Sequence, residues 1–317
     1  MLAFYLHSLS PFLFEFRPGI GLRWYGLAYV LSFLLGFLLY KRLAGRGYTD
    51  LPPAQVSDFI TWAAVFGVFV GGRIGWIVFY GLKQDHAFDP WWWPVEVWKG
   101  GMSSHGGIIG LALFTLYWSR RHRVSWTSIG DCLVVVAPIG LFLVRVANFI
   151  NGELFGRIAN VPWAMLFPAE LYDDLGMRDR LGLRSNEEVS GYIEAARHTP
   201  ELAAELRTVL TPRHPSQLYE AALEGLVLFG ILYWMRTRLR LPRGVLTGAF
   251  FVLYALLRII GEFFREPDRA WSVGPLSAGQ FLSLFMILIG GVFVAYGLRT
   301  REYERAVASP KGRPTTA

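Results

Sequence analysis

The chain has 317 residues, of which 53% are hydrophobic and only 17% are charged. So few charges among so many apolar residues exclude an ordinary soluble domain and indicate an integral membrane protein. The single cysteine, Cys132, excludes a disulfide framework and any cysteine-based metal site.

The first 20 residues lack the basic stretch of a secretory signal and contain Glu15, so we do not interpret them as a cleaved leader. Phe12, Phe14 and Phe16 favour a segment that lies in the membrane interface. We expect an interfacial helix here.

Seven apolar runs follow, each close to the length that crosses about 30 Å of hydrocarbon. They cover residues 24–40, 59–80, 105–118, 129–150, 218–235, 245–264 and 276–298. The third run is short, and we expect it to begin earlier, near Trp98. No soluble linker separates the runs. The sequence therefore predicts one all-α membrane domain over residues 1–317 with seven transmembrane helices.

Basic residues are distributed unevenly between the two ends of these runs. Fifteen follow the odd-numbered runs, at positions 41, 42, 46, 120, 121, 123, 236, 238, 240, 243, 299, 301, 305, 311 and 313. Only six lie in the short segments of the other side, at positions 17, 23, 83, 99, 265 and 269. Since short cytoplasmic loops carry the excess of Lys and Arg, the N-terminus is predicted outside and the C-terminus in the cytoplasm. The same distribution argues against nucleic acid as a partner, because the positive charge is divided among separate membrane-flanking segments.

Two segments lie outside this membrane pattern. Residues 152–213, between the fourth and fifth runs, carry seven basic and ten acidic residues and are predicted to form a small extracytoplasmic cap. Within it, residues 186–210 have helical periodicity that is broken at Pro200. Residues 299–317 are predicted to form a basic cytoplasmic tail.

Polar residues gather at the outer ends of the predicted spans. Arg145, Asn148 and Gly152 recur at helical spacing at the end of the fourth run, so they share one helix face. Asn151 and Glu153 follow at the end of the same run. The members from other runs are Tyr25, Arg73, His105, His214, Tyr254, Arg258 and Glu262. With the predicted topology, all of them converge on the outer leaflet.

Each of these residues also has a structural explanation. The glycines around Arg73 are typical of helix packing, Arg258 and Glu262 have the spacing of an intrahelical ion pair, and Glu220 with Glu224 could be polar packing. Three embedded arginines without partners would nevertheless cost up to roughly 7–10 kcal/mol. Because few carboxylates were expected nearby, the pattern indicates a polar cavity that binds an anion, most naturally a lipid phosphate.

The polar segments together resemble one known family. Segment 145–157 (RVANFINGELFGR) is similar to the signature of the bacterial prolipoprotein diacylglyceryl transferases. The similarity extends, in the family's order, to 23–26 (RWYG), 72–75 (GRIG), 102–107 (MSSHGG), 214–220 (HPSQLYE) and 258–268. Val144, Ala147 and Ser104 depart from the family pattern without removing a charged residue, and we transfer no family role to residues 171–212.

The resemblance implies transfer of a diacylglyceryl group from phosphatidylglycerol to the lipobox cysteine of a prolipoprotein signal peptide, in the bacterial cytoplasmic (inner) membrane. It implies no cofactor and no metal. His105 would be the base, and Arg145 and Arg258 would stabilise the leaving glycerol phosphate. Glu153 and Glu262 would hold the arginines in place. The full set of predicted substrate-binding residues is Tyr25, Arg73, Asn148, Asn151, Glu153, Gly156, His214, Tyr254 and Glu262.

The residues alone are also consistent with other classes of function. A metal site could use His105, His214 and Glu153, but no HExxH spacing occurs. An anionic-lipid transporter or flippase explains the buried arginines equally well. A transporter would need polar residues through the inner halves of the spans. Those halves are almost purely apolar, with Asp131 as the main exception. A phospholipid hydrolase would use water in place of the thiol.

Overall fold

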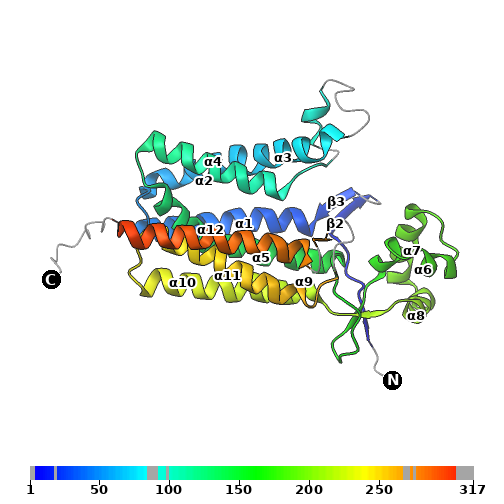
Figure 1. Cartoon of the computed structure of the whole chain (residues 1–317). Coiled ribbons are helices and arrows are strands. Elements are labelled where there is room, and N and C mark those ends of the chain that lie inside the picture. Colours follow the sequence, from blue (N-terminus) through cyan, green and yellow to red (C-terminus); the bar gives the residue numbers. More distant parts are fainter. Residues whose placement is uncertain are drawn as a thin grey trace. The chain divides into compact units, whose positions relative to one another are not determined.

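The computed structural model describes residues 4–17, 20–83, 92–97, 100–266, 272–273 and 276–304 and is mostly helical (Figure 1). The chain divides into two compact units. The first unit consists of Met1–Leu35, Ala137–Tyr233 and Ala249–Gly291. The second consists of Gly36–Val136, Trp234–Gly248 and Val292–Ala317. The end of the predicted basic tail, residues 305–317, lies outside the described residues.

The described elements have the following bounds. The longer helical segments are α1 (Trp24–Gly45), α2 (Val56–Trp62), η2 (Ala63–Val70), α3 (Gly71–Phe79), α4 (Ser104–His122), α5 (Trp126–Asn151), α6 (Leu175–Arg180), α7 (Asn186–His198), α8 (Pro200–Val209), α9 (Ser216–Glu220), η7 (Ala221–Val227), α10 (Leu228–Arg238), α11 (Val245–Glu262) and α12 (Ala278–Thr300). The short helical turns are η1 (Pro53–Gln55), η3 (Gly81–Lys83), η4 (Trp93–Val95) and η6 (Pro168–Tyr172). The strands are β1 (Tyr5–Leu6), β2 (Phe12–Arg17), β3 (Ile20–Arg23), β4 (Met165–Leu166), β5 (Pro212–Arg213), β6 (Ser272–Val273) and β7 (Leu276–Ser277).

Six helices among the described residues are long and apolar enough to cross a membrane. They are Trp24–Gly45, Pro53–Phe79, Trp126–Asn151, Ser216–Arg238, Val245–Glu262 and Gly279–Thr300. They correspond to six of the seven predicted runs. The chain is therefore a multi-pass membrane protein by the length and composition of its helices.

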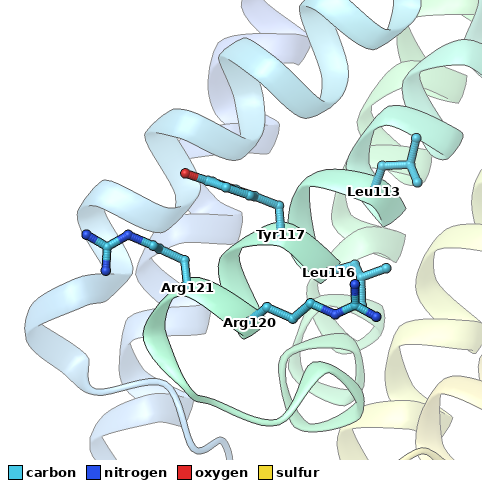
Figure 2. A pocket seen from close by; sticks show the side chains of 5 residues that line it. All are labelled: Leu113, Leu116, Tyr117, Arg120 and Arg121. Carbon is cyan, nitrogen blue, oxygen red and sulfur yellow. The ribbon is translucent and has the colours of Figure 1, made fainter.

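The remaining predicted run forms α4, a helix of 19 residues that is not one of these six. Its first turn contains His105 and two glycines, and its last turn contains Arg120 and Arg121, which lowers its hydropathy. These two arginines, with Leu113, Leu116 and Tyr117, line a pocket (Figure 2). The Arg120 side chain lies beside Leu116 and that of Arg121 extends to the other side of the helix (Figure 2). None of the predicted site residues lines this pocket.

The N-terminal segment is a β-hairpin over its described residues, so the prediction of an interfacial helix is wrong there. β2 pairs antiparallel with β3, with Phe12 opposite Arg23 and Glu15 opposite Gly21. The phenylalanines at positions 12, 14 and 16 recur with a period of two, which is the strand period, and aromatic residues favour strands. Phe14 and Phe16 are 65% and 77% exposed, and their proximity to a membrane interface stays a prediction.

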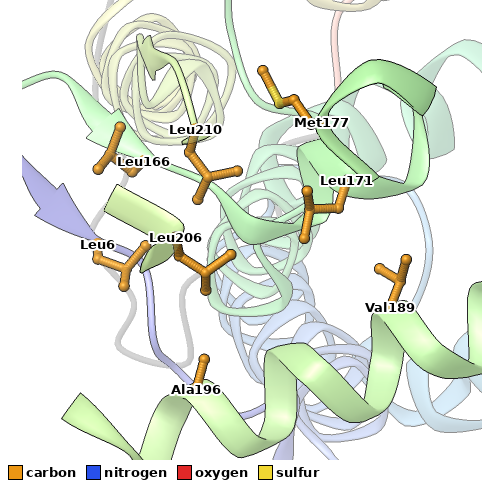
Figure 3. Packing of buried hydrophobic residues seen from close by; sticks show 8 residues of the cluster. All are labelled: Leu6, Leu166, Leu171, Met177, Val189, Ala196, Leu206 and Leu210. Atoms are coloured by element: carbon orange, nitrogen blue, oxygen red, sulfur yellow. The ribbon is translucent and has the colours of Figure 1, made fainter. Parts of the chain in front are cut away.

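Residues 156–213 of the first unit form a small subdomain, with the helices α6, α7 and α8 grouped together (Figure 1). Its strands β4 and β5 form a sheet with β1 of the N-terminal segment, with β1 parallel and β5 antiparallel to β4. Its core is one cluster of buried apolar residues, in which Val189 and Ala196 project from the same face of α7 (Figure 3). The helices α7 and α8 confirm the predicted periodicity and its break, because Pro200 begins α8, a position that needs no backbone N–H.

Asp131 has a structural role within the second unit. Its buried carboxylate accepts three hydrogen bonds of 2.7 Å, from the backbone N–H of Gly244 and from the N–H and hydroxyl of Thr247. It therefore holds the first turn of α11 to α5, satisfying N–H groups that a helix start leaves without partners. Asp131, the main polar residue that a transport path would use, is thus hydrogen-bonded to the start of α11.

Candidate functional site

Two arginines predicted as catalytic meet on the same pair of glutamates within the first unit. Arg145 of α5 lies 2.9 Å from Glu220 and 3.4 Å from Glu224. Arg258 of α11 lies 2.9 Å and 3.2 Å from the same two carboxylates. The glutamates have no exposed side-chain surface, whereas both arginines are 14% exposed. Three helical segments thus bring their charges to one point.

The local fold explains how the glutamates reach α5. Glu220 ends α9, and Glu224 lies in the π-helical turn η7 that follows. Such turns are rare in helices and occur often at functional sites. Gly225 of η7 lies against Phe142 of α5, because a Cβ atom there would be 2.6 Å from the Phe142 Cβ. The close approach places Glu220 and Glu224 beside the last turns of α5.

A third arginine and a third carboxylate complete this arginine–glutamate cluster. Arg258 lies 3.5 Å from Glu262, one turn later in α11, and Arg265 lies 3.7 Å from Glu220. The pairing of Arg258 with Glu262 was predicted from their spacing. The expectation of few carboxylates near the arginines is wrong, since three guanidiniums meet three carboxylates and their formal charges balance. Glu220 and Glu224 were interpreted only as possible polar packing.

Tyr25, Asn148 and Glu153 form a second network in the same unit. The Tyr25 hydroxyl donates to the Glu153 carboxylate, and the Asn148 amide donates to both residues, at 2.8 Å to the carboxylate. The backbone oxygen of Glu153 also accepts a hydrogen bond of 2.6 Å from Gln217. Glu153 was expected to hold an arginine. Its contacts are with Tyr25 and Asn148 instead, because the chain turns at Gly152 (φ 71°) and carries Glu153 out of the helix.

Gly156 and His214 lie where the signature segment meets the start of α9. The Gly156 N–H donates to the His214 carbonyl at 2.9 Å. A Cβ atom at Gly156 would lie 2.4 Å from the Phe264 carbonyl oxygen and 2.7 Å from that of His214, so only glycine fits. His214 Nδ1 lies 3.1 Å from the Tyr219 hydroxyl, and partial burial lowers the pKa of His214.

Asn151 and Tyr254, two further predicted residues of this unit, lie on α5 and α11. Asn151 ends α5, and its side-chain oxygen is buried without a hydrogen-bond partner in the described structure. Tyr254 lies one turn before Arg258 in α11 and stacks on Phe250, with ring centroids 5.8 Å apart. The buried Asn151 oxygen is an acceptor that a ligand hydroxyl could satisfy.

The remaining predicted residues, Arg73 and His105, belong to the second unit. Arg73 lies in α3, is 7% exposed and donates to four backbone carbonyls, those of Trp93, Pro94, Gly100 and Gly101. His105 is the second residue of α4 and is exposed. The substrate-binding role predicted for Arg73 stays a prediction, and its guanidinium has carbonyl partners.

Sequence reasoning missed the role of Glu220 and Glu224, although it had a signal for them. Two glutamates one turn apart inside an apolar span are costly unless they are paired, by the argument already applied to the arginines. Gln217 was quoted only as part of a motif. Its amide holds the Glu153 backbone, and the residue is fully buried.

Comparisons with known proteins agree with the resemblance noted in the sequence. The family model described as prolipoprotein diacylglyceryl transferase matches residues 11–296. A phosphatidylglycerol--prolipoprotein diacylglyceryl transferase of Rhodospirillum centenum is 40% identical over 89% of this chain and 90% of its own length. Proteins with the same name from Sodalis glossinidius and Neisseria gonorrhoeae are 39% and 36% identical, each over 92% of this chain and over 94% and 98% of their own lengths.

Proposed function

This chain belongs to the prolipoprotein diacylglyceryl transferase family, and we propose that it transfers the diacylglyceryl group of phosphatidylglycerol to the lipobox cysteine of prolipoprotein signal peptides. The observation that carries the assignment of the site is the meeting of Arg145 and Arg258 on Glu220 and Glu224. The transfer would be the first step of lipoprotein maturation.

The proposed environment follows the predicted topology. We count α4 (Ser104–His122) as a span in addition to the six helices of spanning length. Seven spans place the N-terminus outside and the C-terminus in the cytoplasm of a bacterial inner membrane. Residues 152–213 then form an extracytoplasmic cap above the outer leaflet. The arginine–glutamate cluster would lie at the outer ends of α5 and α11, within reach of membrane lipids.

The reaction exchanges a carbon–oxygen bond for a carbon–sulfur bond. The cysteine thiolate attacks the carbon of the diacylglyceryl group that carries the phosphate ester, and the thioether bond forms. The bond between this carbon and the phosphate oxygen breaks, and glycerol phosphate leaves with the electrons of that bond. Because a free thiol has a pKa of about 8.5, a base that takes its proton raises the thiolate fraction. We assign this proton transfer to His105.

Arg145 and Arg258 are suited to bind the phosphate although the cluster is formally neutral. A guanidinium carries five N–H donors in a fixed plane, more than these carboxylate contacts use. The glutamates hold both guanidiniums in place before the lipid arrives, which is how fixed donors stabilise charge that develops on a leaving group. Glu262 holds Arg258 from within α11.

The Tyr25–Asn148–Glu153 network is next to the arginine–glutamate cluster, because Asn148 follows Arg145 by one turn of α5. We assign the orientation of the lipid headgroup to Asn148, with the unpartnered Asn151 oxygen as a further acceptor for its glycerol hydroxyls. Tyr25, Gly156, His214 and Tyr254 complete the proposed substrate-binding wall.

A purified-protein assay with labelled phosphatidylglycerol and a lipobox peptide tests the proposal. Release of glycerol phosphate that depends on the peptide and its cysteine supports transfer. Release without the peptide would indicate a hydrolase, and no release with lipid movement across vesicles would indicate a transporter. His105→Gln is expected to insert normally and to lose transfer, so near-normal turnover would remove the assignment of the base.

A further inference from the structure

Arg73 is bonded to the backbone of the segment that leads into α4. Its Nε donates to the Pro94 carbonyl at 2.7 Å, and its Nη2 donates to that of Trp93 at 3.0 Å. Its Nη1 donates to two successive carbonyls, of Gly100 at 2.7 Å and Gly101 at 3.0 Å. The guanidinium also stacks on Trp76, 4.8 Å from the ring centroid. One side chain of α3 thus fixes both ends of this segment.

The glycines at the end of this segment fit around the guanidinium. Gly100 and Gly101 have φ of 85° and 84°, a conformation that other residues rarely adopt. A Cβ atom on Gly101 would lie 2.7 Å from Arg73 Nη1 and 2.8 Å from the Trp76 ring. The turn therefore depends on glycine and is shaped against the side chains of Arg73 and Trp76.

The start of α4 is joined to α3 directly after this turn. The Ser103 N–H donates to the Gly72 carbonyl at 2.9 Å, and the Ser103 side chain accepts a hydrogen bond from Gly106 N at 3.3 Å. Gly75 and Gly106 bring the two backbones into contact, because a Cβ atom on Gly75 would be 2.4 Å from the Gly106 Cα. His105 lies between Ser103 and Gly106, in the first helical turn that these contacts position.

We propose that Arg73 is a positioning residue for His105, acting through the Gly100–Gly101 turn, and not a ligand of the lipid phosphate. This role rests on the proposed function, in which His105 is the base. Arginine suits it because its N–H groups point in several fixed directions and reach carbonyls on both sides of the segment. A lysine ammonium has three donors at a single point and cannot replace this pattern.

Arg73→Lys separates the two roles, because it keeps the charge and removes the geometry. The apparent KM for phosphatidylglycerol in mixed micelles is expected to stay unchanged, while kcat falls about tenfold or more through the misplaced base. Site-resolved modification by diethyl pyrocarbonate reports the imidazole itself. The modification rate at His105 should change at least about twofold, while the rate at His122 of the same helix stays constant. Arg121→Lys, an exposed arginine of α4, is the matched control.

Gly101→Ala is a second variant, which leaves the Arg73 side chain intact. Its Cβ atom disturbs the turn, so it should reproduce the loss of kcat at constant KM. A raised KM with normal kcat in Arg73→Lys, or normal kinetics in Gly101→Ala, would overturn the positioning role. Failure of the proposed function is distinguishable, since the unmodified protein would then show no peptide-dependent transfer.

Discussion

Arg73 and the pair Arg145 and Arg258 offer two solutions to one problem, the burial of a guanidinium in an apolar helix. Arg73 is surrounded by neutral acceptors, four backbone carbonyls at 2.7–3.0 Å. Arg145 and Arg258 share two carboxylates that have no exposed surface. From the sequence, all three arginines had been assigned to anion binding.

The partners of each arginine determine what its guanidinium can do. The N–H donors of Arg73 are bonded to backbone carbonyls. Arg73 thereby connects separate segments of the chain, which suits a structural role. Carboxylates neutralise and orient Arg145 and Arg258 and leave N–H donors over, which suits binding of a second anion. We therefore predict that variants of the carboxylate-bound arginines affect lipid binding and that variants of Arg73 affect the position of the His105 base.

The largest effect is expected for Arg258→Gln. It removes a charge that would stabilise the leaving phosphate, so kcat/KM should fall about a thousandfold, equivalent to about 4 kcal/mol. Peptide-dependent release of labelled glycerol phosphate measures it. Arg180→Gln, at an exposed arginine of α6, is the control and should keep full activity. A loss of tenfold or less would contradict a role of Arg258 in stabilising the leaving phosphate.

Glu220→Gln is expected to destabilise the protein by about 3 kcal/mol, because it breaks a buried ion-pair network. Glu220 contacts Arg145, Arg258 and Arg265, whereas Glu224 contacts only the first two among the ion pairs of the described structure. Glu224→Gln should therefore destabilise less. Unfolding in detergent, followed for both variants, measures the order. Equal or reversed effects would show that the shared carboxylates do not organise the arginines.

His7 extends the comparison to a buried titratable group outside the spans. It directly follows β1, is 5% exposed and stacks on Phe167, and burial lowers its pKa from 6.5 to about 4. The unfolded chain binds a proton below pH 6.5 that the folded protein rejects until about pH 4, so stability falls as pH falls through this window. Between pH 7 and pH 5 the loss should be about 2 kcal/mol. His7→Phe should remove this part of the pH dependence, and an unchanged pH profile would contradict the burial argument.

The smallest effect is expected for Tyr25→Phe. The variant keeps the ring and removes the hydroxyl that donates to Glu153, while Asn148 still donates to the same carboxylate. Loss of one of two hydrogen bonds should lower kcat by about fivefold to tenfold, or about 1 kcal/mol. Steady-state transfer kinetics measure it, with Tyr29→Phe in α1 as the control. A hundredfold loss would mean that the hydroxyl takes part in the chemistry directly.

Much of this architecture could be predicted because it depends on local pattern. Six of the apolar runs are helices of spanning length, and the pairing of Arg258 with Glu262 follows from a spacing of one helical turn. The carbonyl partners of Arg73 could not be predicted, since backbone acceptors leave no trace in residue identity. The pairing of Glu220 with Arg145 depends on which helix faces meet, here through the close approach of Gly225 to Phe142. The β-hairpin at residues 12–23 was missed because its aromatic alternation was interpreted as an interfacial helix.

Lipid retention by the purified protein shows whether Arg145 and Arg258 bind the phospholipid headgroup. Phosphatidylglycerol binding to His105→Gln, which is expected to bind without turning over, is compared with binding to the same variant that also carries Arg145→Gln and Arg258→Gln. We predict that the first protein binds phosphatidylglycerol in preference to zwitterionic phosphatidylethanolamine and that the second loses this preference. Equal retention of phosphatidylglycerol by both proteins would contradict the account.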